Sequence, residues 1–156
     1  MVVHCLKSEG RARCVLQEWF THSIRETEEL GAHLAGELPD GSVLCLYGEL
    51  GAGKTAFVRG LAEGLGITAT VCSPTFTIVN EYPGPRELIH FDMYRLHSAD
   101  ELFDIGWEDY RMRDAILAVE WSENVEEAFD GTEIRIRIDK TGEQDRRITA
   151  EGLPTC

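Results

Sequence analysis

Three short apolar runs along the chain predict strands that are buried on both faces. They cover residues 42–47 (SVLCLY), 88–92 (LIHFD) and 116–120 (ILAVE). Strands inside a sheet that is covered on two sides are near-continuous in apolar residues instead of alternating. The second and third runs each end on a carboxylate, Asp92 and Glu120, so we expect two acids at strand ends.

A helical period precedes and follows the first of these runs. Ser23 and Glu26 have the spacing of a capping box, which predicts a helix over 24–38. A second helix is predicted over 54–65, with Gly66 suited to end it. The apolar residues on the inner faces are Leu30, Leu34 and Leu38 in the first helix and Phe57, Val58, Leu61 and Leu65 in the second.

The end of the chain has a different pattern. Residues 133–139 (EIRIRID) alternate strictly between polar and apolar, and a turn at 140–143 leads into a second run over 146–150. This pattern predicts an antiparallel hairpin with one solvent-exposed face. Residues 12–20 fit either a short strand or part of an N-terminal extension over 1–20.

Residues 48–55 (GELGAGKT) match the phosphate-binding P-loop pattern G-x-x-x-x-G-K-[ST], and they lie between a predicted strand and a predicted helix. We therefore expect one α/β domain over 1–156: a P-loop NTPase-like mixed sheet with helices on both faces and a C-terminal antiparallel hairpin. The expected ligands are a nucleoside triphosphate and Mg²⁺, with ATP favoured because the chain has no N-K-x-D sequence for guanine. The residues expected to bind nucleotide are Gly48, Leu50, Gly51, Ala52, Gly53, Lys54, Thr55, Ser73 and Thr75.

Glycines let such a loop turn its N–H groups toward a phosphate. Lys54 would reach the β- and γ-phosphates, and Thr55 would offer its hydroxyl to Mg²⁺. Asp92 and Glu120 complete the expected catalytic and metal residues, because ligands bind beyond the carboxyl ends of parallel strands. One acid would hold Mg²⁺, directly or through water, and the other would orient or deprotonate the attacking water; the pattern leaves their order open.

The segment 73–77 (SPTFT) allows two interpretations. It is either a phosphate-sensing segment that places hydroxyls near the γ-phosphate, or a turn that leads into a β-like run over 76–80. Trp107 and Trp121 are interpreted as core or interface aromatics in a chain this acidic.

Composition narrows the classes of partner. The formal net charge of −13 disfavours tight, direct binding to nucleic acid, and an acidic surface suits either solubility or docking on a basic protein. No apolar run approaches the roughly 20 residues of a membrane span, and residues 1–10 are too mixed for a signal peptide. The five scattered cysteines have no zinc spacing. A cytoplasmic protein with reduced thiols and no membrane partner is expected.

Four linked segments resemble the TsaE family, the bacterial ATPase subunit of the machinery for N6-threonylcarbamoylation of an adenosine in tRNA. They are LYGELGAGKTAFVRGLAEGLGI, SPTFTIVNEY, HFDMYRL and AVEWSEN, within residues 23–124. The family often has a second Thr where this chain has Ala56, while Thr55 is kept.

The resemblance implies roles for individual residues: Lys54 contacts phosphate, Thr55 and Glu120 serve Mg²⁺, Asp92 is essential for hydrolysis, and 73–76 form a mobile switch. It also implies weak ATPase activity in isolation. The protein would dock on a partner heterodimer and meet tRNA only indirectly, and its ATPase cycle would reset that complex without transferring the group itself.

Three other functions fit part of the pattern. A P-loop GTPase is disfavoured because the chain has no N-K-x-D sequence to recognise guanine. A small-molecule kinase would need arginines at the phosphates, for which Arg111 and Arg113 are the candidates. A nucleotide-dependent protein-binding module without productive hydrolysis would use ATP only to order residues 73–77.

Overall fold

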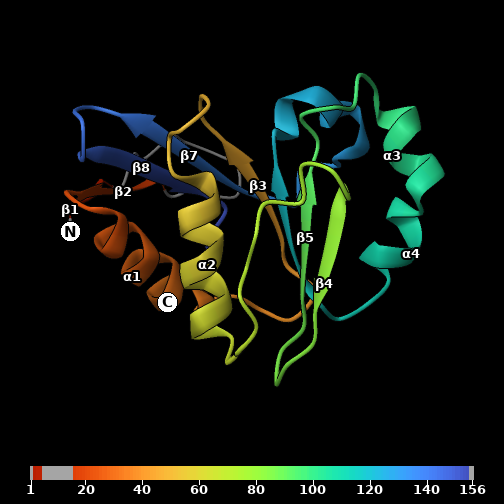
Figure 1. Ribbon diagram of the computed structural model, residues 1–156, viewed down its shortest axis with the longest axis horizontal. Coiled ribbons are helices and arrows are strands. Elements are labelled where there is room, and N and C mark those ends of the chain that lie inside the picture. The colour runs from red at the N-terminus through yellow and green to blue at the C-terminus, as the bar shows by residue number, and fades with distance from the viewer. Residues whose placement is uncertain (1, 5–15, 155–156) are drawn as a thin grey trace, which may run out of the picture.

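A single mixed sheet runs through the computed structural model, which describes residues 2–4 and 16–154 (Figure 1). Its strand order is β1-β2-β8-β7-β3-β6-β5-β4. The strands are β1 (Val2–His4), β2 (Leu16–Thr21), β3 (Val43–Tyr47), β4 (Val79–Tyr82), β5 (Leu88–Asp92), β6 (Ile116–Glu120), β7 (Ile134–Lys140) and β8 (Arg146–Glu151). The four central strands β7, β3, β6 and β5 are parallel, and antiparallel strands extend the sheet on both sides.

Helices cover both faces of the sheet, as the sequence predicts. The helices α1 (Ile24–Ala35) and α2 (Lys54–Gly64) lie side by side on one face. The other face is covered by α3 (Ala99–Ile105), α4 (Trp107–Arg111) and the 3₁₀ segment η1 (Ser122–Ala128). Figure 1 shows the two groups at opposite sides of the view.

The central strand β3 contributes to two hydrophobic cores, one on each face of the sheet. Leu44 and Leu46 belong to the cluster that α1 and α2 complete, whereas Cys45 and Tyr47 belong to the cluster under α3, α4 and η1. Every residue of β3 is buried, because successive side chains of a strand point to opposite faces and both faces are covered.

The backbones of α1 and α2 are in direct contact through glycines. A Cβ atom on Gly60 would lie 1.8 Å from the carbonyl oxygen of Glu28, and one on Gly31 would lie 2.4 Å from the carbonyl oxygen of Phe57. Both distances are far below the 3.4 Å of an ordinary contact. The glycines therefore fix how closely the P-loop helix α2 approaches α1.

The predicted C-terminal hairpin is confirmed. Its two strands, β7 and β8, lie between β3 and β2 in the sheet. Strand β8 pairs with β7 on one side and with β2 on the other. Residues 16–20, which the sequence left between strand and extension, thus belong to strand β2. Residues 5–15 of the possible extension lie outside the described residues.

Two predicted boundaries are wrong. The first helix ends at Ala35 instead of residue 38, because the N–H of Gly36 turns back to the carbonyls of His33 and Leu34. The predicted β-like run over 76–80 is displaced, since β4 begins only at Val79. Ile78 has φ +70°, a left-handed conformation that a regular strand does not accommodate.

The predicted N-cap is confirmed, because the N–H of Glu26 donates to Ser23 Oγ at 3.1 Å, but the return bond of a capping box is shifted by one residue: the Glu26 carboxylate accepts from the N–H of His22. In the described part of the chain, no helix combines the length and apolar character needed to cross a membrane.

Candidate nucleotide-binding site

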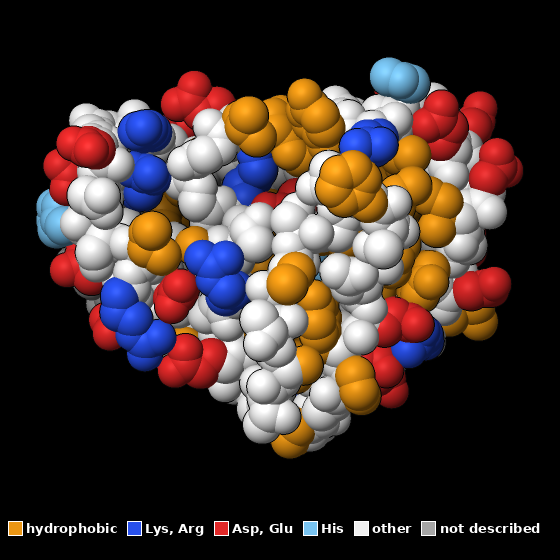
Figure 2. Space-filling view, viewed as in Figure 1, with side chains coloured by type: hydrophobic (Ala, Val, Ile, Leu, Met, Phe, Trp, Pro, Cys, Tyr) orange, Lys and Arg blue, Asp and Glu red, His pale blue; other side chains and the backbone are white. Residues whose placement is uncertain are grey.

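A pocket of about 420 Å³ lies where the carboxyl ends of the central strands meet the start of α2. Figure 2 shows a hollow at this position, near the top of the view, in which basic and acidic side chains lie together beside a hydrophobic group. Its lining includes residues 50–56, Ser73, Thr75, Asp92, Tyr94, Glu120, Trp121 and Arg146, with Ile24 and Arg59 also on its wall.

Almost every nucleotide-binding residue expected from the sequence lines this pocket. The exception is Gly48, which lies just behind it and presents its carbonyl oxygen to Lys54. Arg111 and Arg113, the arginines considered for a kinase, lie elsewhere: Arg111 bonds Asp130 at 3.1 Å, and Arg113 is paired with Glu87.

The P-loop has the backbone geometry of an anion site. Gly48 and Gly53 have φ values of +151° and +108°, which L residues with a side chain rarely adopt. The first backbone bond of α2 joins the N–H of Phe57 to the carbonyl of Gly53. The N–H groups of residues 54–56 consequently have no partner within the helix, and the positive end of its dipole faces the pocket.

Lys54 is buried, with 6% of its surface exposed, although it carries a charged group. Its Nζ donates to the carbonyl of Gly48 and, at 3.3 Å, to that of Glu49, and it lies 3.8 Å from the centre of the Trp121 ring. Burial lowers the pKa of Lys54, and the nearby carboxylate of Glu120 opposes that shift. A cation held so close to the loop favours an anionic ligand.

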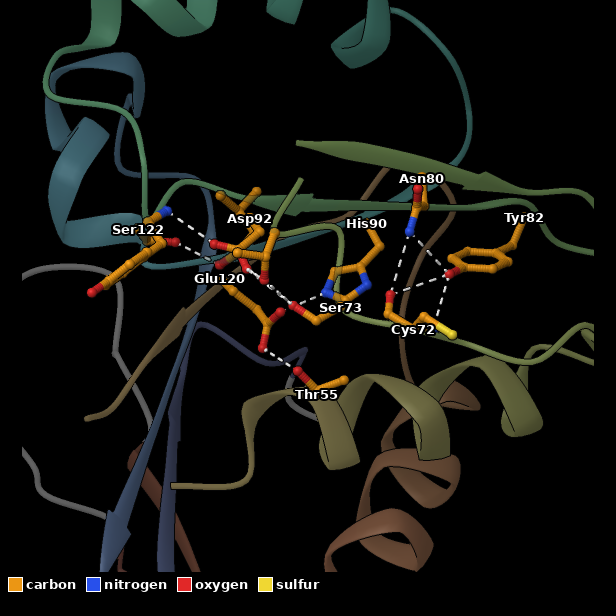
Figure 3. Close-up of polar contacts among 12 residues, drawn as sticks. Thr55, Cys72, Ser73, Asn80, Tyr82, His90, Asp92, Glu120 and Ser122 are labelled. Atoms are coloured by element: carbon orange, nitrogen blue, oxygen red, sulfur yellow. Dashed lines mark hydrogen bonds and ion pairs between the residues drawn. The ribbon is translucent and has the colours of Figure 1, made fainter. Parts of the chain in front are cut away.

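Glu120 is fixed from two sides by side chains of other elements (Figure 3). Thr55 Oγ1 donates to Glu120 Oε1 at 3.0 Å, and His90 Nε2 lies 2.9 Å from Glu120 Oε2. His90 is fully buried and 3% of Glu120 is exposed. The other ring nitrogen of His90 has no partner among the described residues, which fits the tautomer that donates its Nε2 proton to the carboxylate.

This arrangement fits a bound Mg²⁺. The ion prefers oxygen ligands and is usually held by one or two carboxylates together with phosphate and water. Thr55 Oγ1 and Glu120 Oε1 provide two such oxygens at the start of α2. The described residues contain no cluster of three His, Cys, Asp or Glu side chains that could hold a metal without these other ligands.

Asp92 lies beside Glu120 in the register of β5 and β6, but it binds a different segment. Its Oδ2 accepts hydrogen bonds from Ser73 Oγ at 3.1 Å and from Thr75 Oγ1 at 3.2 Å (Figure 3). Its Oδ1 accepts from the N–H of Tyr94 at 2.9 Å. The hydroxyls of Ser73 and Thr75 thus lie at the pocket on Asp92, whereas the Thr77 hydroxyl donates to Asn80 Oδ1 at 2.8 Å.

Three residues of the site were not selected from the sequence. His90 could have been found, because it is a polar residue in an apolar run and shares a face with Asp92 two positions later. Trp121 is expected from the sequence to be a core or interface aromatic, and its ring contacts the Lys54 ammonium. Arg146 reaches the P-loop from β8, and nothing in the local sequence marks it.

Comparisons with known proteins agree with this site. The model of a family described as "Threonylcarbamoyl adenosine biosynthesis protein TsaE" matches residues 21–148. The tRNA threonylcarbamoyladenosine biosynthesis protein TsaE of Bacillus subtilis is 42% identical over 133 residues, which are 85% of this chain and 83% of that protein. The protein of the same name from Treponema pallidum is 38% identical over 137 residues, 88% of this chain and 98% of the relative.

A solved structure extends the similarity to the fold. The crystal structure of Bacillus subtilis YdiB superposes with a TM-score of 0.79 at 34% sequence identity, and the match covers 92% of this chain and 90% of that one. The match to the family spans the P-loop, both acids and most of the C-terminal hairpin. On these grounds, the chain belongs to the TsaE family.

Proposed function

We propose that this protein binds and hydrolyses Mg·ATP as a subunit of the machinery that makes threonylcarbamoyladenosine in tRNA. The observation that carries the proposal is the placement of Glu120, which is held by Thr55 of the P-loop helix on one oxygen and by buried His90 on the other. The names of the relatives supply the pathway.

The P-loop and Lys54 would bind the phosphates. The free N–H groups at the start of α2 donate to phosphate oxygens, and Lys54 exchanges its contacts with the carbonyls of Gly48 and Glu49 for the β- and γ-phosphates. Trp121 stays against the ammonium and keeps water from one side of it.

Thr55 and Glu120 would hold the metal, while Asp92 would serve the attacking water. Glu120 is suited to the metal because one of its oxygens already lies 3.0 Å from the Thr55 hydroxyl. Bound Mg²⁺ would supply the positive charge that neutralises the β- and γ-phosphates as the bond breaks. Asp92 orients the water and accepts a proton at Oδ2, the oxygen that Ser73 and Thr75 occupy here.

The contact between Asp92 and the hydroxyls of Ser73 and Thr75 supports a switch. Ser73 and Thr75 can bind either Asp92 or a phosphate group, so nucleotide binding would move the segment. Phe76 in this segment is 85% exposed and Leu50 of the P-loop is 81% exposed. Exposed apolar residues at the rim of the pocket suit docking on a protein partner.

In this function, the partner is the protein heterodimer that carries the transfer chemistry, and tRNA is met only through it. The ATPase cycle resets that complex between turnovers. The net charge of −13 is compatible with docking on a basic protein surface and disfavours direct binding to tRNA.

Phosphate release from Mg·ATP tests the proposal, with the protein alone and then with the heterodimer and tRNA. We expect weak turnover alone and stimulation in the complex. Glu120→Gln should lower the stimulated rate by about 100-fold or more, because it removes a ligand of the metal. Glu127→Gln is the matched control, because it makes the same charge change on the exposed side of η1 outside the pocket.

The outcomes separate the other functions. Nucleotide binding with background turnover in every mixture would favour a protein-binding module in place of an ATPase. A phosphorylated metabolite in place of free phosphate would favour a kinase, although neither Arg111 nor Arg113 lines the pocket. Preferential binding of GTP over ATP would favour a GTPase.

A further inference from the structure

Arg146, the first residue of β8, extends from the C-terminal hairpin to the P-loop, where it lines one wall of the pocket. Its Nε donates to the carbonyl oxygen of Ala52 at 2.7 Å, and its Nη2 donates to that of Gly51 at 3.3 Å. These bonds join residues 94 and 95 positions apart in the sequence. The P-loop is therefore supported by a strand on the far side of β7.

The third nitrogen of Arg146 binds the turn between β7 and β8. Nη1 donates to the carbonyls of Gly142 and Glu143 at 3.2 Å and to that of Asp145 at 2.9 Å. All five acceptors are neutral carbonyls, and among the described residues no carboxylate lies within ion-pair distance of Arg146. A planar guanidinium whose three nitrogens all donate is held in place, and no ion pair compensates its charge beside the phosphate loop.

The contact with Ala52 determines the direction of the next N–H group. In a trans peptide, the C=O of one residue and the N–H of the next point in opposite directions. Because the carbonyl of Ala52 points to Arg146, the N–H of Gly53 points away from it. The preceding peptide is fixed as well, since the N–H of Ala52 donates to the carbonyl of Glu49 at 3.0 Å.

This support matters because a glycine on each side of Ala52 gives the loop little conformational preference of its own, and Ala52 N–H supplies one internal hydrogen bond. Gly51 and Gly53 have φ values of +78° and +108°, and glycine populates many backbone conformations at little cost. A loop of this composition loses conformational entropy when it binds a phosphate, unless another element has already ordered it.

We propose that Arg146 is a positioning residue of the nucleotide site. It holds the Gly51–Ala52–Gly53 peptides in the phosphate-binding conformation before ATP arrives, and its uncompensated charge favours the anion. This inference rests on the proposed ATP binding and goes beyond it, since it makes the C-terminal hairpin part of the site. Arg146 need not touch the reacting atoms.

Arg147 provides a matched control one residue further along β8. Its side chain lies on the opposite side of the strand from Arg146, where its Nε donates to Glu18 Oε2 at 2.6 Å. It does not line the pocket. Arg147→Met therefore removes the same charge from the same strand without touching the P-loop.

Equilibrium titration with a fluorescent ATP analogue and Mg²⁺ measures the effect directly. We expect Arg146→Met to weaken binding by about 10- to 100-fold and Arg147→Met to change it by less than about twofold. Arg146→Lys should stay at least about 10-fold weaker than wild type, because an ammonium keeps the charge but cannot reproduce the planar fork. In the partner complex, KM for ATP should rise more than kcat falls in Arg146→Met.

Amide spectra separate positioning from a loss of folding. In ¹⁵N-labelled Arg146→Met we expect a folded spectrum with the largest shifts at the amides of 51–54. Shifts confined to the turn 141–145 would overturn the inference, as would ATP binding by Arg146→Met equal to that of Arg147→Met. Full recovery of affinity in Arg146→Lys would also overturn it, since charge alone would then suffice.

Failure of the proposed function gives a different result. If wild type and Arg147→Met bind neither ATP nor its analogue, the proposed ATP binding is wrong and the inference falls with it. If both bind and Arg146→Met binds equally well, only the role of Arg146 is refuted.

Discussion

Gly60→Ala is expected to destabilise the protein through the contact between α1 and α2. The new Cβ would lie 1.8 Å from the carbonyl oxygen of Glu28, whereas an ordinary contact begins at 3.4 Å. The two atoms must therefore separate by about 1.6 Å, the difference between these values. Both are attached to helix backbone, so no side chain can rotate away to relieve the clash.

The magnitude follows from the packing that such a separation disturbs. Overpacking a well-packed core costs about 1–3 kcal/mol, and we take the upper end because the obstacle is backbone. Alanine gains about 1 kcal/mol over glycine inside a helix, which offsets part of that cost. The expected net loss is about 2 kcal/mol of unfolding free energy, or about 4–8 °C in Tm for a chain of this size.

Thermal unfolding followed by circular dichroism measures the loss, with Gly36→Ala as the control. Gly36 has an ordinary φ of −68°, and a Cβ there would lie 3.5 Å from the nearest atom, the carbonyl oxygen of His33. We expect that variant to match or slightly exceed wild type. Equal Tm values for Gly60→Ala and Gly36→Ala would refute the reasoning, because the helices could then separate without cost.

Three further predictions concern His90, Asp92 and the cysteine thiols. His90→Leu removes the donor to Glu120, so calorimetric titration should require about 10- to 100-fold more Mg²⁺ for half-maximal ATP binding; an unchanged titration would contradict the positioning of the carboxylate. Asp92→Asn should slow single-turnover hydrolysis by about 100-fold or more while leaving ATP affinity nearly unchanged; hydrolysis at the wild-type rate would exclude Asp92 as the proton acceptor. Burial raises the pKa of Cys45 to about 12, so at pH 8 iodoacetamide should alkylate exposed Cys72 and spare Cys45, as mass spectrometry of native protein can check; equal labelling would show that the strand opens.

The central part of the site could be predicted from the sequence for two reasons. Its strand, loop and helix are consecutive in the chain, and the carboxyl ends of parallel strands lie at one edge of the sheet. A buried strand, a glycine loop and a helix follow one another directly over residues 43–64. Asp92 and Glu120 each end a buried run, and parallel strands bring such ends to the same edge. In the structure the two acids are register partners.

The contacts that were missed depend on which strands become neighbours. His90 reaches Glu120 only because β5 lies beside β6, and Arg146 reaches Ala52 only because the hairpin joins the edge of β3. The alternating pattern of a hairpin does not indicate which other strand of the sheet it will pair with. The short segments α3, α4 and η1 span five to seven residues each, too few for a helical period to stand out.

The displaced strand near Ile78 has a different cause. The residues of 76–80 include β-branched and aromatic types that favour strands, but the N–H of Ile78 is bonded to the carbonyl of Pro74 at 2.6 Å. The carbonyl of Ile78 accepts in turn from the N–H of Asp92. A local turn and one tertiary contact with Asp92 thus override the strand propensity of this segment.

The place of β8 between β2 and β7 has a consequence for the order in which a ribosome delivers this chain. Ala150 is the register partner of both Gln17 and Ile136, so this half of the sheet closes only after residues near position 150 have left the exit tunnel. Until then the nascent chain presents the edge of β2, and then the edge of β7, that pairs with β8 without that partner. Such unpaired edges attract other chains, so translation of the last two strands is the interval in which chaperones would matter most for this protein.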